Sequence, residues 1–288
     1  MYNKKKYLIV PLLLPLLLVT AFFIFYPAVI NVYNGAFVFR HKLDDNPIFV
    51  GLKNVTDLLA DKVFWTALKN TGILVVLVIF VQVGLALILA LLVDNINKKY
   101  AAFLRIIYFM PIVISATAIG TMYLLLIQPT GLFTKLVFKD VFYWLPTNNS
   151  RALFVVMAPI LWQYIGFYFV ILLTGLSTIP EEYKEAALID GASKMQVIRH
   201  ITIPMLWNVL RTCMVLAITG ALKVFDLPHT IAVHGAPAQQ TVFMGTYNYY
   251  LYSATRLGQS AVYSVFIVLI GVLVSLLSNA VLRENKDI

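Results

Sequence analysis

Charged residues are scarce in this chain of 288 residues: they make up 12% of it, whereas hydrophobic residues make up 61%. Soluble domains are usually nearer half apolar and a quarter charged. A globule of this size cannot bury so much apolar surface, so we expect lipid to cover part of it. The composition therefore predicts an all-α integral membrane protein.

Residue types and motifs that many enzymes need are also missing. The single cysteine, Cys213, lies in an apolar run, which excludes an intrachain disulfide and a cysteine metal cluster. The four histidines have no ligand spacing, and the motifs HExxH, CxxC and GxSxG are absent. The phosphate loop GxxxxGK[ST] is absent too. We predict no catalytic residues, no metal and no cofactor on this chain.

Basic residues outnumber acidic ones and give a formal net charge of +9. Such an excess is compatible with a nucleic-acid partner, but the Lys and Arg residues flank apolar runs, as membrane topology requires. We therefore predict contact with membrane lipid and no nucleic acid.

Uncharged windows of about 20 residues or more predict membrane-spanning helices. Six are expected, within a single transmembrane domain over residues 1–288, at 8–34, 69–94, 104–128, 152–177, 206–231 and 260–282. The first follows three lysines like a signal peptide, but it is long, contains prolines and lacks a small-residue cleavage site, so we interpret it as a retained helix. The lysines favour a cytoplasmic N-terminus, and six spans return the C-terminus to the same side.

A polar segment, residues 178–204, separates the fourth and fifth predicted spans. Thr178 and Glu181 have the spacing of a capping box, which predicts a helix that runs to Ile189 or Asp190.

A glycine then predicts a reversal of the chain, because Gly191 lacks the Cβ that would resist it. Ser193 and Gln196 repeat the capping-box spacing and begin a second helix, and Pro204 ends that helix or begins the next span. Asp190 either caps the second helix or holds the elbow.

Small residues lie in the middle of the first helix, at Ala186 and Ala187, and its start is acidic. Helices that float at a membrane surface prefer bulky apolar residues and Lys or Arg. The pattern favours a protein partner, although composition alone leaves both possibilities open.

The run EAALIDGASKMQVIRHITIP resembles the EAA motif of permease subunits of ABC importers. The motif falls on Glu185-Ala186-Ala187, Asp190-Gly191-Ala192, Ile201 and Pro204. Three further segments are similar to the carbohydrate-importing branch of this family, of maltose, lactose and glycerol-3-phosphate type. They are FVGLKNVTDLLADKVFWTALKNT, FMPIVISATAIG and VFDLPHTIAVHGAPAQQT. Gly235-Ala236-Pro237 departs from the Gly-Gly-Pro of that branch.

The resemblance implies that residues 178–204 hold a cytoplasmic coupling helix that docks in a cleft of a separate ATPase. The residues expected at or near that contact are Glu181, Glu182, Glu185, Ala186, Ala187, Asp190 and Gly191. The implied partners are a second permease subunit in a heterodimer, two ATPase subunits that bind ATP and Mg²⁺, and an extracellular sugar-binding protein. The implied location is the prokaryotic cytoplasmic membrane.

Two groups of side chains are candidates for the substrate path. Sugars are bound by aromatic faces and hydrogen-bonding groups, and span four carries Trp162, Tyr164 and Tyr168. Span five carries Lys223 and Asp226 at i, i+3, where pairing would lower the cost of two charges in the membrane. Packing is the alternative role for the aromatic residues, and a structural ion pair is the alternative for the charges.

Two functions follow from these patterns. The first is a permease subunit of an ABC importer that passes a sugar or oligosaccharide inward by alternating access. The second is a self-contained secondary transporter that uses Lys223 and Asp226 for ion coupling. That class usually has more spans, often as internal repeats, and no clear repeat is visible.

Overall fold

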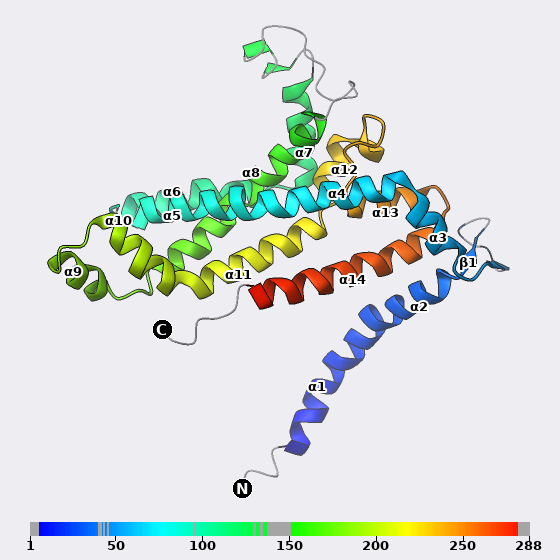
Figure 1. Cartoon of the computed structure of the whole chain (residues 1–288), viewed down its shortest axis with the longest axis horizontal. Coiled ribbons are helices and arrows are strands. Elements are labelled where there is room, and N and C mark those ends of the chain that lie inside the picture. Colours follow the sequence, from blue (N-terminus) through cyan, green and yellow to red (C-terminus); the bar gives the residue numbers. More distant parts are fainter. Residues whose placement is uncertain are drawn as a thin grey trace. The chain divides into compact units, whose positions relative to one another are not determined.

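The computed structural model describes residues 6–39, 42, 44, 46–94, 96–128, 131, 132, 135, 136 and 151–281, and these are mostly helical (Figure 1). The chain divides into two compact units. One comprises Met1–Lys62 with Asn248–Ile270, and the other comprises Val63–Tyr247 with Gly271–Ile288. The single transmembrane domain over 1–288 stays a prediction.

The first unit begins with an apolar helical stretch and continues with short elements. In chain order these are α1 (Lys6–Thr20), the π-helical segment η2 (Ala21–Phe25), α2 (Tyr26–Asn34), β1 (Phe37–Val38), β2 (Ile48–Phe49) and α3 (Lys53–Ala60). β1 and β2 pair antiparallel, with Phe37 opposite Phe49. This two-stranded pair departs from the all-α prediction without changing the mainly helical character.

A buried asparagine holds the turn between α2 and β1. Asn54 is 3% exposed, and its Nδ2 donates to the carbonyl oxygens of Gly35 and Phe37, both at 2.8 Å. Buried carbonyl groups need donors, so this one amide fixes α3 against the turn.

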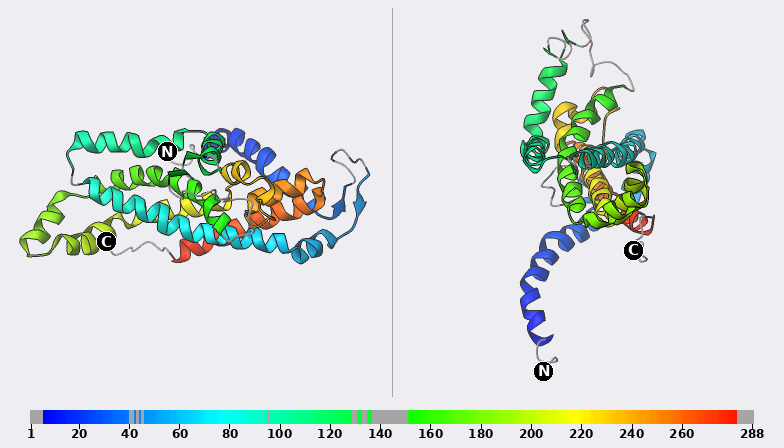
Figure 2. Two further views of the ribbon diagram at one scale, coloured as in Figure 1. Left: turned by 90° about the horizontal axis from the view of Figure 1, so that it is seen from above. Right: turned by 90° about the vertical axis from the view of Figure 1, so that its left-hand side faces the viewer.

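The second unit holds most of the helices, and the last two helices have residues in both units. The elements are α4 (Lys62–Leu77), η3 (Val78–Val83), α5 (Gly84–Asp94), α6 (Lys98–Val113), α7 (Ala116–Ile127), α8 (Arg151–Leu176), α9 (Glu181–Ile189), α10 (Lys194–Val197), η5 (Ile198–Thr202), α11 (Ile203–Leu222), α12 (Asp226–Ile231), η6 (Val233–Gly235), α13 (Met244–Ser253) and α14 (Leu257–Val281). Figure 2 shows α9 at one end of the second unit.

Helix α8 is the centre of the second unit, where it packs against α5, α6, η3 and α11. The side chains of Met157, Phe169 and Leu172 on α8 are fully buried. Gln82 joins η3 to α8, because its Nε2 donates to the carbonyl oxygen of Ile160 at 2.8 Å. Such a hydrogen bond between helices is a common packing role for a glutamine in a membrane protein.

Five helical stretches are long and apolar enough to cross a membrane, and a bent pair makes up to six. The five are Leu13–Asn34, Lys62–Asp94, Ala152–Leu176, Lys194–Ile231 and Leu257–Ser278. The pair is Lys99–Val113 with Ala116–Ile127, which meet at 91° and so differ from the single helix expected at 104–128. The range expected at 206–231 holds two regular helices, because α11 ends at Leu222 and α12 begins at Asp226.

Candidate functional site

Helix α9 presents its side chains outward in the structure. None of its residues is buried, and Tyr183, Leu188 and Ile189 are 55%, 47% and 86% exposed. Exposed apolar side chains that cluster on a short helix are typical of an interaction surface.

A backbone motif ends α9 at the predicted glycine. Gly191 has φ +87°, and its N–H donates to the carbonyl oxygen of Leu188 at 3.1 Å. The N–H of Ala192 donates to that of Ala187 at 3.0 Å. This pair of bonds is the Schellman motif, whose left-handed residue is usually glycine. The reversal predicted at Gly191 is confirmed.

The second helix begins with the predicted capping box. The N–H of Ser193 donates to Oε1 of Gln196 at 2.7 Å, and the N–H of Gln196 donates to Oγ of Ser193 at 3.4 Å. Asp190 is exposed, and in the described structure its side chain makes no hydrogen bond. Pro204 lies in the first turn of α11, where a missing N–H costs little.

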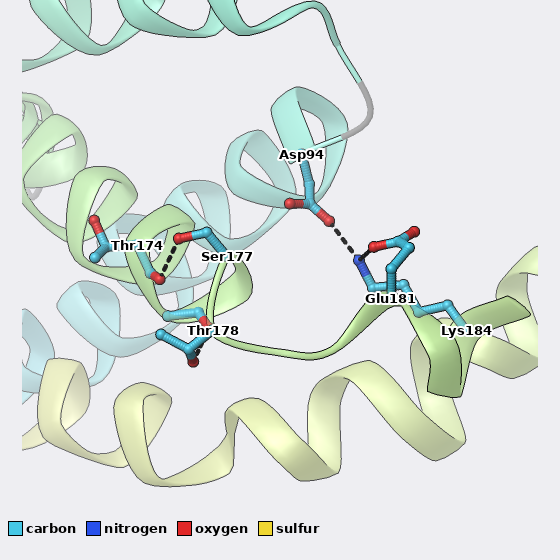
Figure 3. Close-up of polar contacts among 7 residues, drawn as sticks. Asp94, Thr174, Ser177, Thr178, Glu181 and Lys184 are labelled. Carbon is cyan, nitrogen blue, oxygen red and sulfur yellow. Dashed lines mark hydrogen bonds and ion pairs between the residues drawn. The ribbon is translucent and has the colours of Figure 1, made fainter.

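The capping box predicted at Thr178 and Glu181 is wrong. Pro180 precedes α9, and no side chain caps the helix there. The hydroxyl of Thr178 donates instead to the carbonyl oxygen of Gly175 at 2.7 Å, and Ser177 donates in the same way to Thr174 (Figure 3). The last carbonyl groups of a helix lack partners within it, so carbonyl oxygens at the end of α8 accept hydrogen bonds from these two hydroxyls.

An ion pair connects α9 to α5 (Figure 3). Nζ of Lys184 lies 3.0 Å from Oδ2 of Asp94 and 3.2 Å from Oε2 of Glu181. Burial disfavours the charge of Lys184, but the hydrogen bonds and negative charges of Asp94 and Glu181 outweigh it and raise its pKa. Lys184 is therefore positively charged at neutral pH.

A cavity of about 330 Å³ lies within the second unit. The residues that line it are Val78, Gln82, Ile112, Ala116, Ile160, Gln163, Tyr164, Phe167, Tyr168, Leu216, Ala217, Gly220, Ala221, Lys223, Val224, Phe225, Asp226 and Leu227. Four of the five residues predicted for the substrate path, Tyr164, Tyr168, Lys223 and Asp226, therefore lie around one space. The fifth, Trp162, does not line this cavity and is 52% exposed.

Gln163 lines the same cavity but was not among the predicted residues. It is 3% exposed, and within the described part of the chain its amide makes no hydrogen bond. The hydroxyl of Tyr168, a residue 4% exposed, likewise has no hydrogen-bond partner there. A buried amide normally has a partner, so Gln163 is suited to bind a polar molecule in the cavity. A glutamine within an apolar span is costly, and that signal was available in the sequence.

Lys223 and Asp226 form no ion pair with each other in the described structure. Lys223 follows the last residue of α11, and Asp226 is the first residue of α12. A positive charge is favourable at a helix C-terminus and a negative charge at an N-terminus. Each charge is thus stabilised by the end of its own helix, which reduces the need for the predicted pair.

The comparisons with known proteins agree with this architecture. A family described as the inner membrane component of binding-protein-dependent transport systems matches residues 82–285. The chain belongs to this family. Its members are transport components of ABC systems, so the permease is not itself an enzyme.

Curated relatives match along most of their length. The probable ABC transporter permease protein YurN of Bacillus subtilis is 30% identical over 100% of both chains. The lactose transport system permease protein LacF of Rhizobium radiobacter is 29% identical over 83% of this permease and 82% of the relative. The sn-glycerol-3-phosphate transport system permease protein UgpA of Agrobacterium fabrum is 30% identical, over 91% and 90%.

Solved structures share the fold. A chain of a bacterial ABC transporter involved in the import of the acidic polysaccharide alginate matches with a TM-score of 0.82 and 21% identity, over 99% of this permease and 98% of that chain. The alginate transporter in complex with a periplasmic protein that holds an alginate pentasaccharide also matches with a TM-score of 0.82, over 97% and 95%. At this identity the match shows that the permease has the ABC importer fold.

Proposed function

We propose that the chain is the membrane-spanning permease subunit of a binding-protein-dependent ABC importer, and that it passes a sugar or oligosaccharide inward by alternating access. The sugar is supported by the lactose permease among the relatives and by the alginate transporter among the structures. The cavity has the size of small-ligand sites, about 300–1,000 Å³, and presents aromatic rings beside polar groups.

One observation carries the mechanism: α8 and α11 both line the cavity, and the chain joins them through α9 and its elbow. A partner that moves α9 as a rigid body would therefore tilt two walls of the cavity. We assign α9 the role of coupling helix between the fourth and fifth of six spans, with both termini in the cytoplasm.

The remaining parts of the importer belong to other chains. A second permease subunit would complete a heterodimer, and two ATPase subunits would bind ATP and Mg²⁺. An extracellular sugar-binding protein would deliver the substrate. Family membership does not favour the alternative of a secondary transporter coupled to ions through Lys223 and Asp226.

Crosslinking tests the role of α9. Cysteines that replace Ala186 and Ala187 should capture the ATPase subunit in membranes, because both positions are accessible on α9. A cysteine at Phe80, which is 73% exposed in the middle of a spanning stretch, is the matched control and should capture no ATPase. Capture of lipid or of this chain alone from positions 186 and 187 would rule out the coupling role.

Uptake measurements test the cavity. Gln163→Leu and Tyr168→Phe each remove one hydrogen-bonding group at similar volume, and a lost hydrogen bond of about 1 kcal/mol lowers affinity roughly fivefold. We expect the sugar concentration for half-maximal uptake to rise by that factor in assembled complexes. Trp162→Phe, outside the cavity, should leave it unchanged. Unchanged uptake in both cavity variants would remove α8 from the substrate path.

A further inference from the structure

Two charges in the second unit lie at unfavourable ends of their helices. Asp94 is the last residue of α5, where the carbonyl end of the helix repels a negative charge. Lys184 lies near the start of α9, where the N–H end repels a positive charge. Local helix energetics disfavours both residues, so their placement calls for an interaction outside their own helices.

That interaction is the ion pair between them (Figure 3). The Lys184 and Asp94 side chains are only 15% and 18% exposed, so water and salt screen the pair less than they would on an open surface. The Glu181 carboxylate, 66% exposed, is a more screened partner. The ion pair with Asp94 is therefore the stronger of the two ion pairs that Lys184 forms.

The pair joins α9 to a helix that the chain does not connect to it. Sequence links α9 only to α8 and, through α10 and η5, to α11. Asp94 ends the stretch Lys62–Asp94, whose middle residues Val78 and Gln82 line the cavity. The ion pair at Asp94 thus connects α9 to the stretch that forms a third wall of the cavity, besides α8 and α11.

We propose that Lys184 is a positioning residue that ties α9 to the end of α5 through Asp94, so that movement of α9 is transmitted to the α4–η3–α5 stretch as well as to α8 and α11. This rests on the proposed function, in which an ATPase moves α9. The salt bridge lets α9 act directly on this third wall of the cavity, whereas after its loss the stretch follows α9 only through its packing against α8 and α11.

Distance measurement in the intact importer tests the tie directly. Spin labels on cysteines that replace Leu92 and Leu188, 63% and 47% exposed, report the separation of α5 and α9. Cys213 is fully buried and should stay unlabelled. We expect the separation in the otherwise native complex to stay the same with and without ATP, and to shift or broaden on ATP binding once Lys184→Met is added. A separation that changes with ATP while Lys184 is intact overturns the proposal, whatever the variants do.

Transport efficiency tests the consequence. Sugar taken up per ATP hydrolysed should fall at least about fivefold in Lys184→Met and in Asp94→Asn. Lys184→Arg should retain it, and exchange of the two charges in Asp94→Lys/Lys184→Asp should restore much of it. Lys99→Met is the matched control, because it removes an exposed lysine that forms no ion pair in the described structure, and should be near wild type. Assembled single variants with normal uptake per ATP would show that the pair only stabilises the fold.

The crosslink from position 187 separates this inference from the proposed function. Absence of an ATPase crosslink would defeat both. An intact crosslink combined with an α5–α9 separation that varies with ATP would defeat only the tie through Lys184.

Discussion

Replacement of Gly166 by alanine should force α6 and α8 apart. A Cβ built on Gly166 would lie 1.6 Å from the carbonyl oxygen of Tyr108 and 2.2 Å from its carbonyl carbon, whereas real Cβ contacts do not fall below 3.0 Å. The two backbones must therefore separate by about 1.4 Å at this point. Backbone cannot rotate away as a flexible side chain can, so the strain spreads along both helices.

Overpacking of this kind costs about 1–3 kcal/mol or more. Gly166 lies on α8 between Gln163 and Tyr168, so the same displacement moves the cavity face. We expect Gly166→Ala to lower the thermal unfolding midpoint of the purified complex and to reduce uptake in whatever complex assembles.

Gly72→Ala in α4 is the matched control, because a Cβ there meets nothing within 4 Å and alanine favours a helix by up to about 1 kcal/mol. It should leave the midpoint unchanged or raise it. If Gly166→Ala and Gly72→Ala gave the same midpoint and the same uptake, the close approach of α6 to α8 would be refuted.

Two further substitutions have clear expected outcomes. Asn70 is 4% exposed and its Nδ2 donates to the carbonyl oxygens of Gln240 and Val242 at 2.7 and 2.8 Å, so Asn70→Ala should destabilise the complex by about 1–3 kcal/mol, measured by thermal unfolding. Exposed Asn208→Ala should cost little, and equal effects would contradict the role of the two bonds. Lys223→Met should leave the amount of assembled complex unchanged, since no ion pair to Asp226 is lost in the described structure, and should reduce uptake, because Lys223 lines the cavity. A fall in assembly with normal uptake per complex would instead indicate that Lys223 has a structural role.

The hydrophobic pattern predicted the positions of the membrane-spanning helices in the sequence better than it predicted the bends within them. A window without charges measures apolar length, and Lys62–Asp94 and Ala152–Leu176 are straightforward cases. The window at 104–128 is also long and apolar, but it holds a bend of 91° at Ile114 and Ser115, whose ψ angles of 136° and 134° are not helical. Pro111 lies inside α6, three residues before this break, so the proline did not mark the position of the bend, and its direction depends on packing.

The elbow after α9 was predictable because everything that makes it is local. Gly191 supplies the left-handed conformation, and the Ser193 and Gln196 side chains are three residues apart. The error at Thr178 has the opposite cause. Two helix ends lie within a few residues there, and the sequence does not say which end takes the hydroxyl.

Charge placement on helices explains which lysine–aspartate pair formed. Lys223 and Asp226 are close in sequence, yet each already lies at the favourable end of its own helix and the two remain apart in the described structure. Lys184 and Asp94 are far apart in sequence, and each lies at the end that its helix disfavours. A charge that its own helix stabilises gains less from a partner than a charge that its helix destabilises. The spacing of three residues therefore suggested an ion pair between Lys223 and Asp226, which does not form in the described structure. The preference of helix ends for one sign of charge, once the helix boundaries are known, instead indicates the pair of Lys184 and Asp94, which joins α9 to α5.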